Sequence, residues 1–171
     1  SQSEKYPYDT WAKQGFLTLI DGPVIIPSVI ARAIAEVSHD YDLQLLSYDR
    51  WRINDIIREL DNIGILAQTY DGNSFQKQSG VLPVAPFGQG FKDMAPAVDK
   101  LERLVAQRNL CHGGNPILNM CAAGAVIEQD PAGNRKLTKK KSLSRIDGLV
   151  ALAMALGNVA NETDVEATSP W

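Results

Sequence analysis

The sequence predicts an α/β fold with a partly parallel sheet. Short apolar segments of strand length alternate along the chain with amphipathic segments of helical periodicity, and glycine or proline separates most of them. Strands that alternate with helices are typical of parallel β-α-β units. The chain has 171 residues, of which 44% are hydrophobic and 22% charged, which is enough for one domain with a hydrophobic core.

The elements follow from the spacing of apolar residues and from the turn residues between them. Helices are expected at 6–15, 27–38, 50–64 and 94–109, from 116 onward, and at 142–156. Strands are expected at 16–20, 43–49, 81–90, 125–129 and 135–139, the last two forming a hairpin. Residues 66–80 are polar and rich in turn residues, so they are predicted to form a long loop. Two prolines make 81–90 an edge or irregular strand.

The chain is expected to form a single domain over 1–157, followed by a flexible acidic tail over 158–171. This tail contains Glu162, Asp164 and Glu166 but no lysine or arginine. The start of the sequence shows no signal peptide, and no apolar run reaches the ~20 residues needed to span a bilayer. Cys111 and Cys121 have no C-x-x-C spacing, so they are predicted to be reduced in a soluble, intracellular protein.

Charge is distributed unevenly. The net charge of −3 argues against a wholly basic nucleic-acid-binding protein. One segment, however, carries cations and no acids: Arg135, Lys136, Lys139, Lys140, Lys141 and Arg145. Such a run is often a solvated loop, and it is also suited to contacting a phosphate backbone. Walker A, G-x-G-x-x-G and G-x-S-x-G motifs are absent, so nucleotide hydrolysis and serine-hydrolase chemistry have no support in the sequence.

Two carboxylates stand at positions where α/β folds place functional groups. Asp49 ends the apolar segment 43–49, and Asp147 begins a helix that otherwise reads as buried. Acidic residues at a strand end and a helix start can hold Mg²⁺, which prefers hard oxygen ligands. Each residue also has a structural interpretation, Asp49 as a helix cap and Asp147 as a favourable charge at a helix N-terminus.

The segment Cys-His-Gly-Gly-Asn-Pro at 111–116 allows two interpretations as well. Its glycines and the following helix start could meet a phosphate. Alternatively, the segment is a tight turn in which Asn115 caps a helix that begins at Pro116.

Four stretches taken together resemble a known family: LLSYDRW, FGQGFKDMAPAVDKLERLV, LCHGGNPILNMCAAGAVIEQDPAGNRKLTKKKS and SRIDGLVALAMALG. They are similar to the C-terminal nuclease region of tailed-phage terminase large subunits, and the likeness runs from about Tyr8 to Gly157. The resemblance implies a ribonuclease H-like (RuvC/terminase nuclease type) fold. It further implies an acidic two-metal site that cuts concatemeric phage DNA during genome packaging.

The resemblance also implies roles for particular residues. Asp49 and Asp147 match catalytic carboxylates that would ligate Mg²⁺ or Mn²⁺. His112 and Asn115 could contact those carboxylates without binding the metal themselves. The cations of 135–145 would lie near the DNA backbone. The implied partners are double-stranded DNA, the terminase ATPase domain, the portal and the small terminase subunit, with no membrane involved. The implied location is the host cytoplasm, at the procapsid portal.

Three departures from the family pattern bear on these expectations. The strand that carries the family's first catalytic aspartate is not found before Tyr6, and the ATPase is not present in the sequence. Gly124 stands where a polar residue such as asparagine is expected. Two functions therefore remain open, an incomplete metal-dependent nuclease and a catalytically incomplete module that docks DNA or the motor. A relative of Holliday-junction resolvases is a third possibility. It is weaker, because the HGGNP and DPAGN stretches point to terminases.

Overall fold

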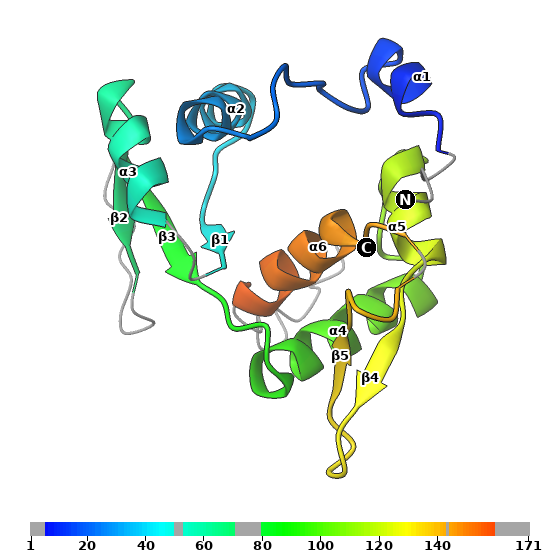
Figure 1. The fold of residues 1–171 in the computed structure, drawn as a ribbon. Coiled ribbons are helices and arrows are strands. Elements are labelled where there is room, and N and C mark those ends of the chain that lie inside the picture. Colours follow the sequence, from blue (N-terminus) through cyan, green and yellow to red (C-terminus); the bar gives the residue numbers. More distant parts are fainter. Residues whose placement is uncertain (1–5, 50–52, 71–79, 143, 160–171) are drawn as a thin grey trace, which may run out of the picture.

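The computed structural model describes residues 6–49, 53–70, 80–142 and 144–159. Its elements, in chain order, are α1 (Tyr8–Lys13), α2 (Pro27–Asp40), β1 (Leu46–Tyr48), α3 (Ile53–Asn62), β2 (Leu66–Thr69), β3 (Val81–Pro86), α4 (Phe91–Ala106), α5 (Pro116–Ala123), β4 (Ile127–Gln129), β5 (Arg135–Leu137) and α6 (Asp147–Asn158). Figure 1 shows a parallel sheet with α2 and α3 at one end of the molecule and a helical group with a hairpin at the other.

The larger sheet has the order β1-β3-β2, and both pairings are parallel, as the sequence predicts. Residues 81–85 of the central strand are all buried. Ala31 of α2 and Leu60 of α3 form a buried cluster with Leu82 and Val84 of β3. The strongly amphipathic pattern of α3 explains why it covers the sheet, since one face of this helix is apolar.

Of the two alternatives for 81–90, an edge or an irregular strand, the edge position is wrong, because β3 is central despite its prolines. Val84 O accepts a hydrogen bond from Tyr70 N on the β2 side, and Phe87 N donates to Tyr48 O on the β1 side. Successive residues of a parallel strand face opposite neighbours, so Pro83 faces the β1 side, where pairing begins only at Val84. Pro86 faces the β2 side, where pairing ends at Val84. Each missing N–H therefore lies where no ladder partner exists.

Two other predictions for the first half of the chain are wrong. Residues 16–20 form no strand, and their exposed apolar side chains include Phe16, Leu19 and Ile20. Residues 66–69, predicted as part of a long loop, form β2 instead. Pairing with β3 turns this short segment into a strand, which its own composition does not indicate. Residues 71–79 of the predicted loop lie outside the described residues.

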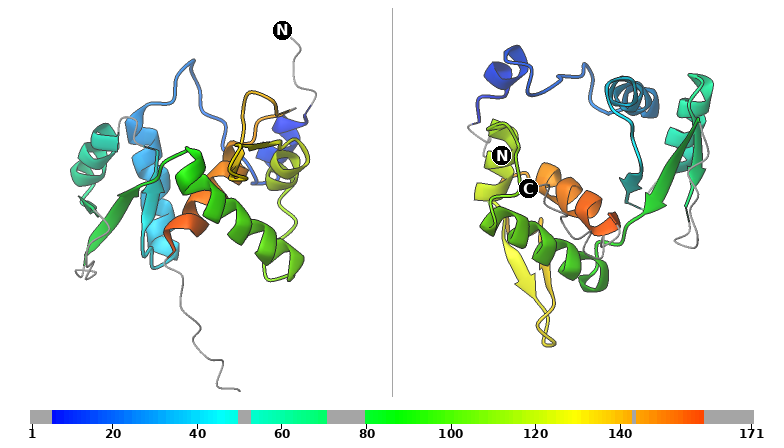
Figure 2. Two further views of the ribbon diagram at one scale, coloured as in Figure 1. Left: turned by 90° about the horizontal axis from the view of Figure 1, so that it is seen from below. Right: turned by 180° about the vertical axis from the view of Figure 1, so that it is seen from behind.

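The second layer is built from α4, α5 and α6, which bury a cluster around Met94, Val98, Cys121, Ile146 and Val150. The antiparallel pairing of β4 with β5 confirms the hairpin predicted for 125–139, and the hairpin lies against α4. Figures 1 and 2 show α6 between α4 and strand β1, so this helix joins the two clusters. A helix covered on two sides explains why α6 is apolar around most of its circumference.

The helix α6 is shorter at its start than predicted, because it begins at Asp147 rather than 142. It also includes Asn158, the first residue of the predicted tail, whose side chain donates a hydrogen bond to Ser47 Oγ at 2.9 Å. Residues 160–171 lie outside the described residues. The helix predicted at 94–109 is observed at Phe91–Ala106.

Candidate nuclease site

Asp147 is the first residue of α6 and follows Ile146, which is 1% exposed. Burial of Ile146 anchors the start of the helix, while the Asp147 side chain remains 63% exposed. Its Oδ1 lies 2.5 Å from the ammonium nitrogen of Lys139. The charge of this carboxylate is therefore compensated twice, by a cation and by the positive end of the helix dipole.

A groove of about 420 Å³ is lined in part by Arg145, Asp147 and Gly148. A second groove of about 450 Å³ shares Gly148 and contains His112 and Asn115. The two segments that the sequence singles out, 111–116 and 145–148, therefore face neighbouring hollows of one surface. Arg145 lines the same groove as Asp147.

The segment 111–116 has the geometry of the tight turn. Gly113 and Gly114 have positive φ angles of 60° and 69°. Asn115 Oδ1 accepts hydrogen bonds from Ile117 N and Leu118 N, both at 3.0 Å. Asn115 is thus the N-cap of α5, and its side-chain oxygen is already used by the helix. His112 is exposed and lines the second groove.

Asp49 directly follows β1 and is exposed. Its Oδ2 accepts a hydrogen bond from Gln89 Nε2 at 3.0 Å. Gln89 belongs to the turn after the neighbouring strand β3, so both side chains stand at the carboxyl edge of the parallel sheet. This is the placement that the sequence predicts for Asp49.

The structure does not bring the two carboxylates together. Asn158, the last residue of α6, contacts Ser47 on β1, and Figure 1 shows the C-terminal end of α6 beside β1. Asp49 directly follows β1, so it lies near this end of α6. Asp147 lies at the opposite end of this 12-residue helix, roughly 16 Å away along its axis. No group of three or more His, Cys, Asp or Glu side chains within the described ranges could hold a metal ion.

Each aspartate alone offers the hard oxygen donors that Mg²⁺ and Mn²⁺ prefer. At Asp147, however, the groove contains only this carboxylate, with the cations Lys139 and Arg145 beside it, so the described residues alone do not complete a divalent-metal site there. A single site that includes both carboxylates does not fit this arrangement.

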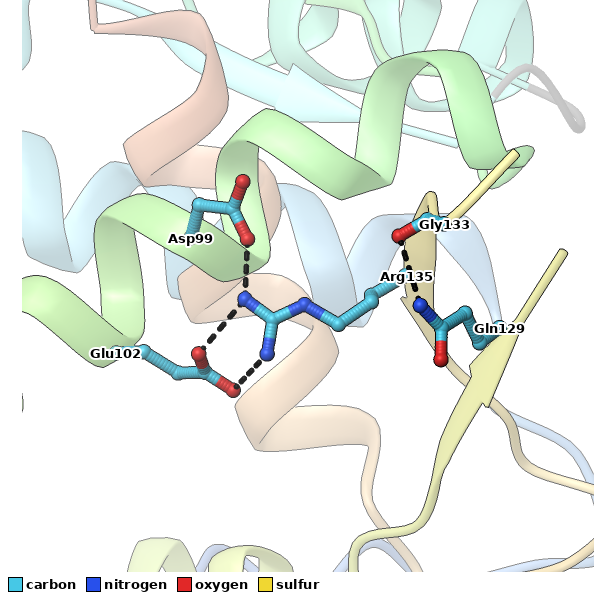
Figure 3. Close-up of polar contacts among 5 residues, drawn as sticks. All are labelled: Asp99, Glu102, Gln129, Gly133 and Arg135. Atoms are coloured by element: carbon cyan, nitrogen blue, oxygen red, sulfur yellow. Dashed lines mark hydrogen bonds and ion pairs between the residues drawn. The ribbon is translucent and has the colours of Figure 1, made fainter. Parts of the chain in front are cut away.

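The basic run 135–145 is more strongly paired than its sequence suggests. Arg135 Nη1 donates to Glu102 Oε1 at 3.0 Å, and Nη2 lies 2.8 Å from Glu102 Oε2 and in close contact with Asp99 Oδ1. Figure 3 shows this guanidinium between the two acids of α4. The hydrogen bond to Asp99 and the pairing with Glu102 raise the pKa of Arg135 above its ordinary value. Arg135 therefore fastens β5 to α4.

The lysines of the run divide into paired and more open side chains. Lys136 Nζ lies 4.3 Å from the centre of the Phe91 ring and 3.8 Å from Glu128 Oε2. Lys141 Nζ lies 3.6 Å from Glu128 Oε1. For the exposed Lys140, no ion pair with another described residue is found. DNA contact by this run stays a prediction, and Lys140 is its best-placed lysine.

Sequence reasoning missed the acids that neutralise this run. Asp99 and Glu102 stand three residues apart on the exposed face of α4, a spacing that places two side chains on one helix face. That spacing was the available signal, but nothing in the sequence links the face to β5.

The departure at Gly124 has a packing explanation. A Cβ atom at this position would lie 1.9 Å from Ser144 Oγ. Ser144 in turn donates to Met120 O at 3.2 Å, near the end of α5. The glycine therefore makes room for a buried serine, and an asparagine side chain would require Ser144 to move.

None of the helices in the described ranges is long and apolar enough to cross a membrane. Comparisons with known proteins agree on one family. The family model for the terminase large subunit endonuclease domain matches residues 1–163. The large terminase subunit of Enterobacteria phage HK97 is 41% identical over 162 residues, which cover 95% of this chain and 29% of that protein. Protein YmfN of Escherichia coli K12 is 26% identical over 153 residues, covering 88% of this chain and 30% of that protein.

The fold agrees with these sequence matches. The crystal structure of the HK97 large terminase superposes with a TM-score of 0.75 at 43% identity, over 88% of this chain and 28% of that one. The match confirms the predicted α/β class, and the arrangement is consistent with a ribonuclease H-like nuclease. The chain spans less than a third of the length of the relatives it matches. By sequence and by fold, the chain belongs to the terminase large subunit endonuclease domain family.

Proposed function

We propose that this chain is the nuclease part of a DNA-packaging terminase and cuts concatemeric viral DNA with the help of divalent metal. The family match over residues 1–163 supports nuclease activity. The observation that supports a particular site is the position of the exposed Asp147, which begins α6 and lines one groove together with Arg145. Bound Mg²⁺ or Mn²⁺ would polarise the phosphodiester and activate water.

The chain's own residues have separate tasks in this proposal. Asp147 and Asp49 are the metal ligands, and Lys140 and Arg145 contact the DNA backbone near Asp147. Because α6 separates the two aspartates, each needs further ligands of its own. We extend the proposal to the partners that the resemblance implies. These are double-stranded DNA, the ATPase domain, the portal and the small subunit, which meet at the procapsid in the host cytoplasm.

A second candidate function has one observation in its favour. The distance between Asp49 and Asp147 and the lack of a three-ligand cluster among the described residues suit a module that binds DNA or the motor without cutting. The two candidates differ in one measurable property, which is metal-dependent cleavage.

Plasmid cleavage by the 171-residue chain tests the proposal, with Mn²⁺ or EDTA and with D49N, D147N and D61N variants. Asp61 is an exposed aspartate on α3 and serves as the matched control. We expect Mn²⁺-dependent nicking that D147N and D49N each reduce at least tenfold and D61N leaves unchanged. A folded chain that binds duplex DNA but never cuts it would favour the second candidate. Cleavage that survives EDTA would contradict the metal role.

A further inference from the structure

The loop between β3 and α4 holds Gln89 on an anchored backbone. Phe87, two residues before it, is 5% exposed, and its N–H donates to Tyr48 O at 2.8 Å. On the other side, Gly90 O accepts a hydrogen bond from the N–H of Met94, which is 2% exposed, at 3.0 Å. Gln89 therefore lies between two anchored residues, and this limits where its side chain can reach.

The same loop fits closely against the first turn of α4. A Cβ atom at Gly88 would lie 1.9 Å from Asp93 Oδ2, so any larger residue would require the Asp93 side chain to move. The strand that precedes Asp49 is fixed from another side, because Asn158 of α6 donates to Ser47 Oγ. The backbones near Gln89 and Asp49 are thus held independently of the contact between these two side chains.

The contact itself engages one carboxylate oxygen of Asp49. Gln89 Nε2 donates to Asp49 Oδ2 at 3.0 Å, and for Oδ1 no hydrogen-bond partner is found in the part of the chain that the structure describes. A side-chain amide is neutral, so it orients a carboxylate without cancelling the negative charge. Asp147 differs in this respect, because its partner Lys139 is a cation.

We propose that Gln89 is a positioning residue for DNA cleavage, which orients the charged Asp49 carboxylate and leaves Oδ1 for the reacting groups. A reacting group that is already held in one orientation does not have to be ordered in each turnover, and this lowers the barrier. The inference rests on the proposed participation of Asp49 in cleavage. It concerns the orientation of this one side chain and requires no ion at Asp147.

The orientation of Asp49 can be measured by NMR on the whole 171-residue chain. Q89L removes the donor at similar size, and Q44L is the matched control, because Gln44 Nε2 donates to the exposed Asp42 at 2.6 Å, before β1 begins. Three-bond couplings between Asp49 Cγ and its backbone report the χ1 rotamer. We expect one dominant rotamer in the wild type and in Q44L, and averaging over several in Q89L. Q89E, which places a like charge beside Asp49, should show averaging as well.

Plasmid nicking by the same variants tests the consequence for the reaction. Q89L should lower kcat about threefold to tenfold, the scale of one hydrogen bond, and should change the KM for DNA less than about twofold. Q44L should behave like the wild type, and circular dichroism should show that all variants are folded.

Three results would overturn the inference. They are unchanged Asp49 couplings in Q89L, a kcat in Q89L equal to that of the wild type, and a raised KM at constant kcat, which would make Gln89 a DNA contact. A folded wild type that does not nick DNA would reject the proposed function instead. The couplings would then still decide whether Gln89 orients Asp49.

Discussion

Asn158 at the end of α6 donates a hydrogen bond to Ser47 on β1 at 2.9 Å. This contact connects the helical layer with the parallel sheet. The buried residues of α6 belong to the core of the helical layer. It also shows that the C-terminal end of α6 lies near the sheet edge at Asp49, so the length of this helix separates the two candidate carboxylates.

The coupling between Asn158 and Ser47 can be measured in a double-mutant cycle. N158A and S47A should each lower the free energy of unfolding by about 1 kcal/mol, and the double variant should lose less than the sum, because both remove the same hydrogen bond. Urea unfolding provides the values. N119A, at an exposed position on α5, is the control and should change stability by less than about 0.5 kcal/mol. Strictly additive losses would mean that the contact does not connect the layers.

Two glycines of α6 should respond oppositely to alanine. A Cβ atom at Gly157 would lie 2.4 Å from Phe87 Cε2 and 3.0 Å from Ala97 Cβ, whereas one at Gly148 would meet Cys121 Sγ at 3.4 Å. G157A should therefore destabilise the protein by about 1–3 kcal/mol through overpacking. G148A should be neutral or should stabilise by up to about 1 kcal/mol, because alanine favours the helix. Thermal unfolding compares the two, and equal effects would contradict the packing of Phe87 on Gly157.

Much of this fold can be predicted from local sequence patterns. The periodicity of 27–38 and 50–64 indicates helices that the structure confirms as α2 and, in its described part, α3. The apolar run ending at Asp49 indicates β1. The failures concern pairing, which is a tertiary property. The segment 66–69 becomes a strand because β3 lies beside it, and the prolines of β3 are tolerated because of the pairing register.

The candidate site shows the same limit. The sequence places Asp49 at a strand end and Asp147 at a helix start, and the structure agrees with both local positions. The sequence does not indicate which end of α6 contacts β1, because an apolar helix can pack in either direction. It also does not identify Lys139 as the partner of Asp147, since the turn at Thr138–Ser142 brings that lysine back toward the helix start.

DNA binding should depend more on Lys140 than on Arg135. The guanidinium of Arg135 is already engaged by Asp99 and Glu102, whereas Lys140 is exposed. K140M should therefore weaken duplex binding and reduce the slope of log affinity against log salt by about 0.9, the value for one lost phosphate contact. R135M should leave the slope nearly unchanged. Fluorescence anisotropy over a salt series measures both.

A variant of the acid partner sharpens this comparison. D99N should increase DNA affinity, because it removes a negative charge and loosens one partner of Arg135. If R135M reduces the salt slope as much as K140M does, Arg135 contacts DNA despite its acidic partners, and the distinction between paired and open cations is wrong.

The turn of the β4–β5 hairpin should weaken in acid. Asp130 accepts hydrogen bonds from Asn134 Nδ2 at 2.9 Å, Asn134 N at 2.8 Å and Ala132 N at 3.0 Å. The Asn134 side chain contributes most to lowering the pKa of Asp130 below its ordinary value of 3.8. Because the pKa is lower in the folded state, the stabilisation is present above the unfolded-state pKa and is lost as the pH falls through the folded value. N134A should move the Asp130 pKa upward in a carboxyl-carbon NMR titration, while N119A should not; an unchanged pKa in N134A would show that the backbone amides alone hold the turn.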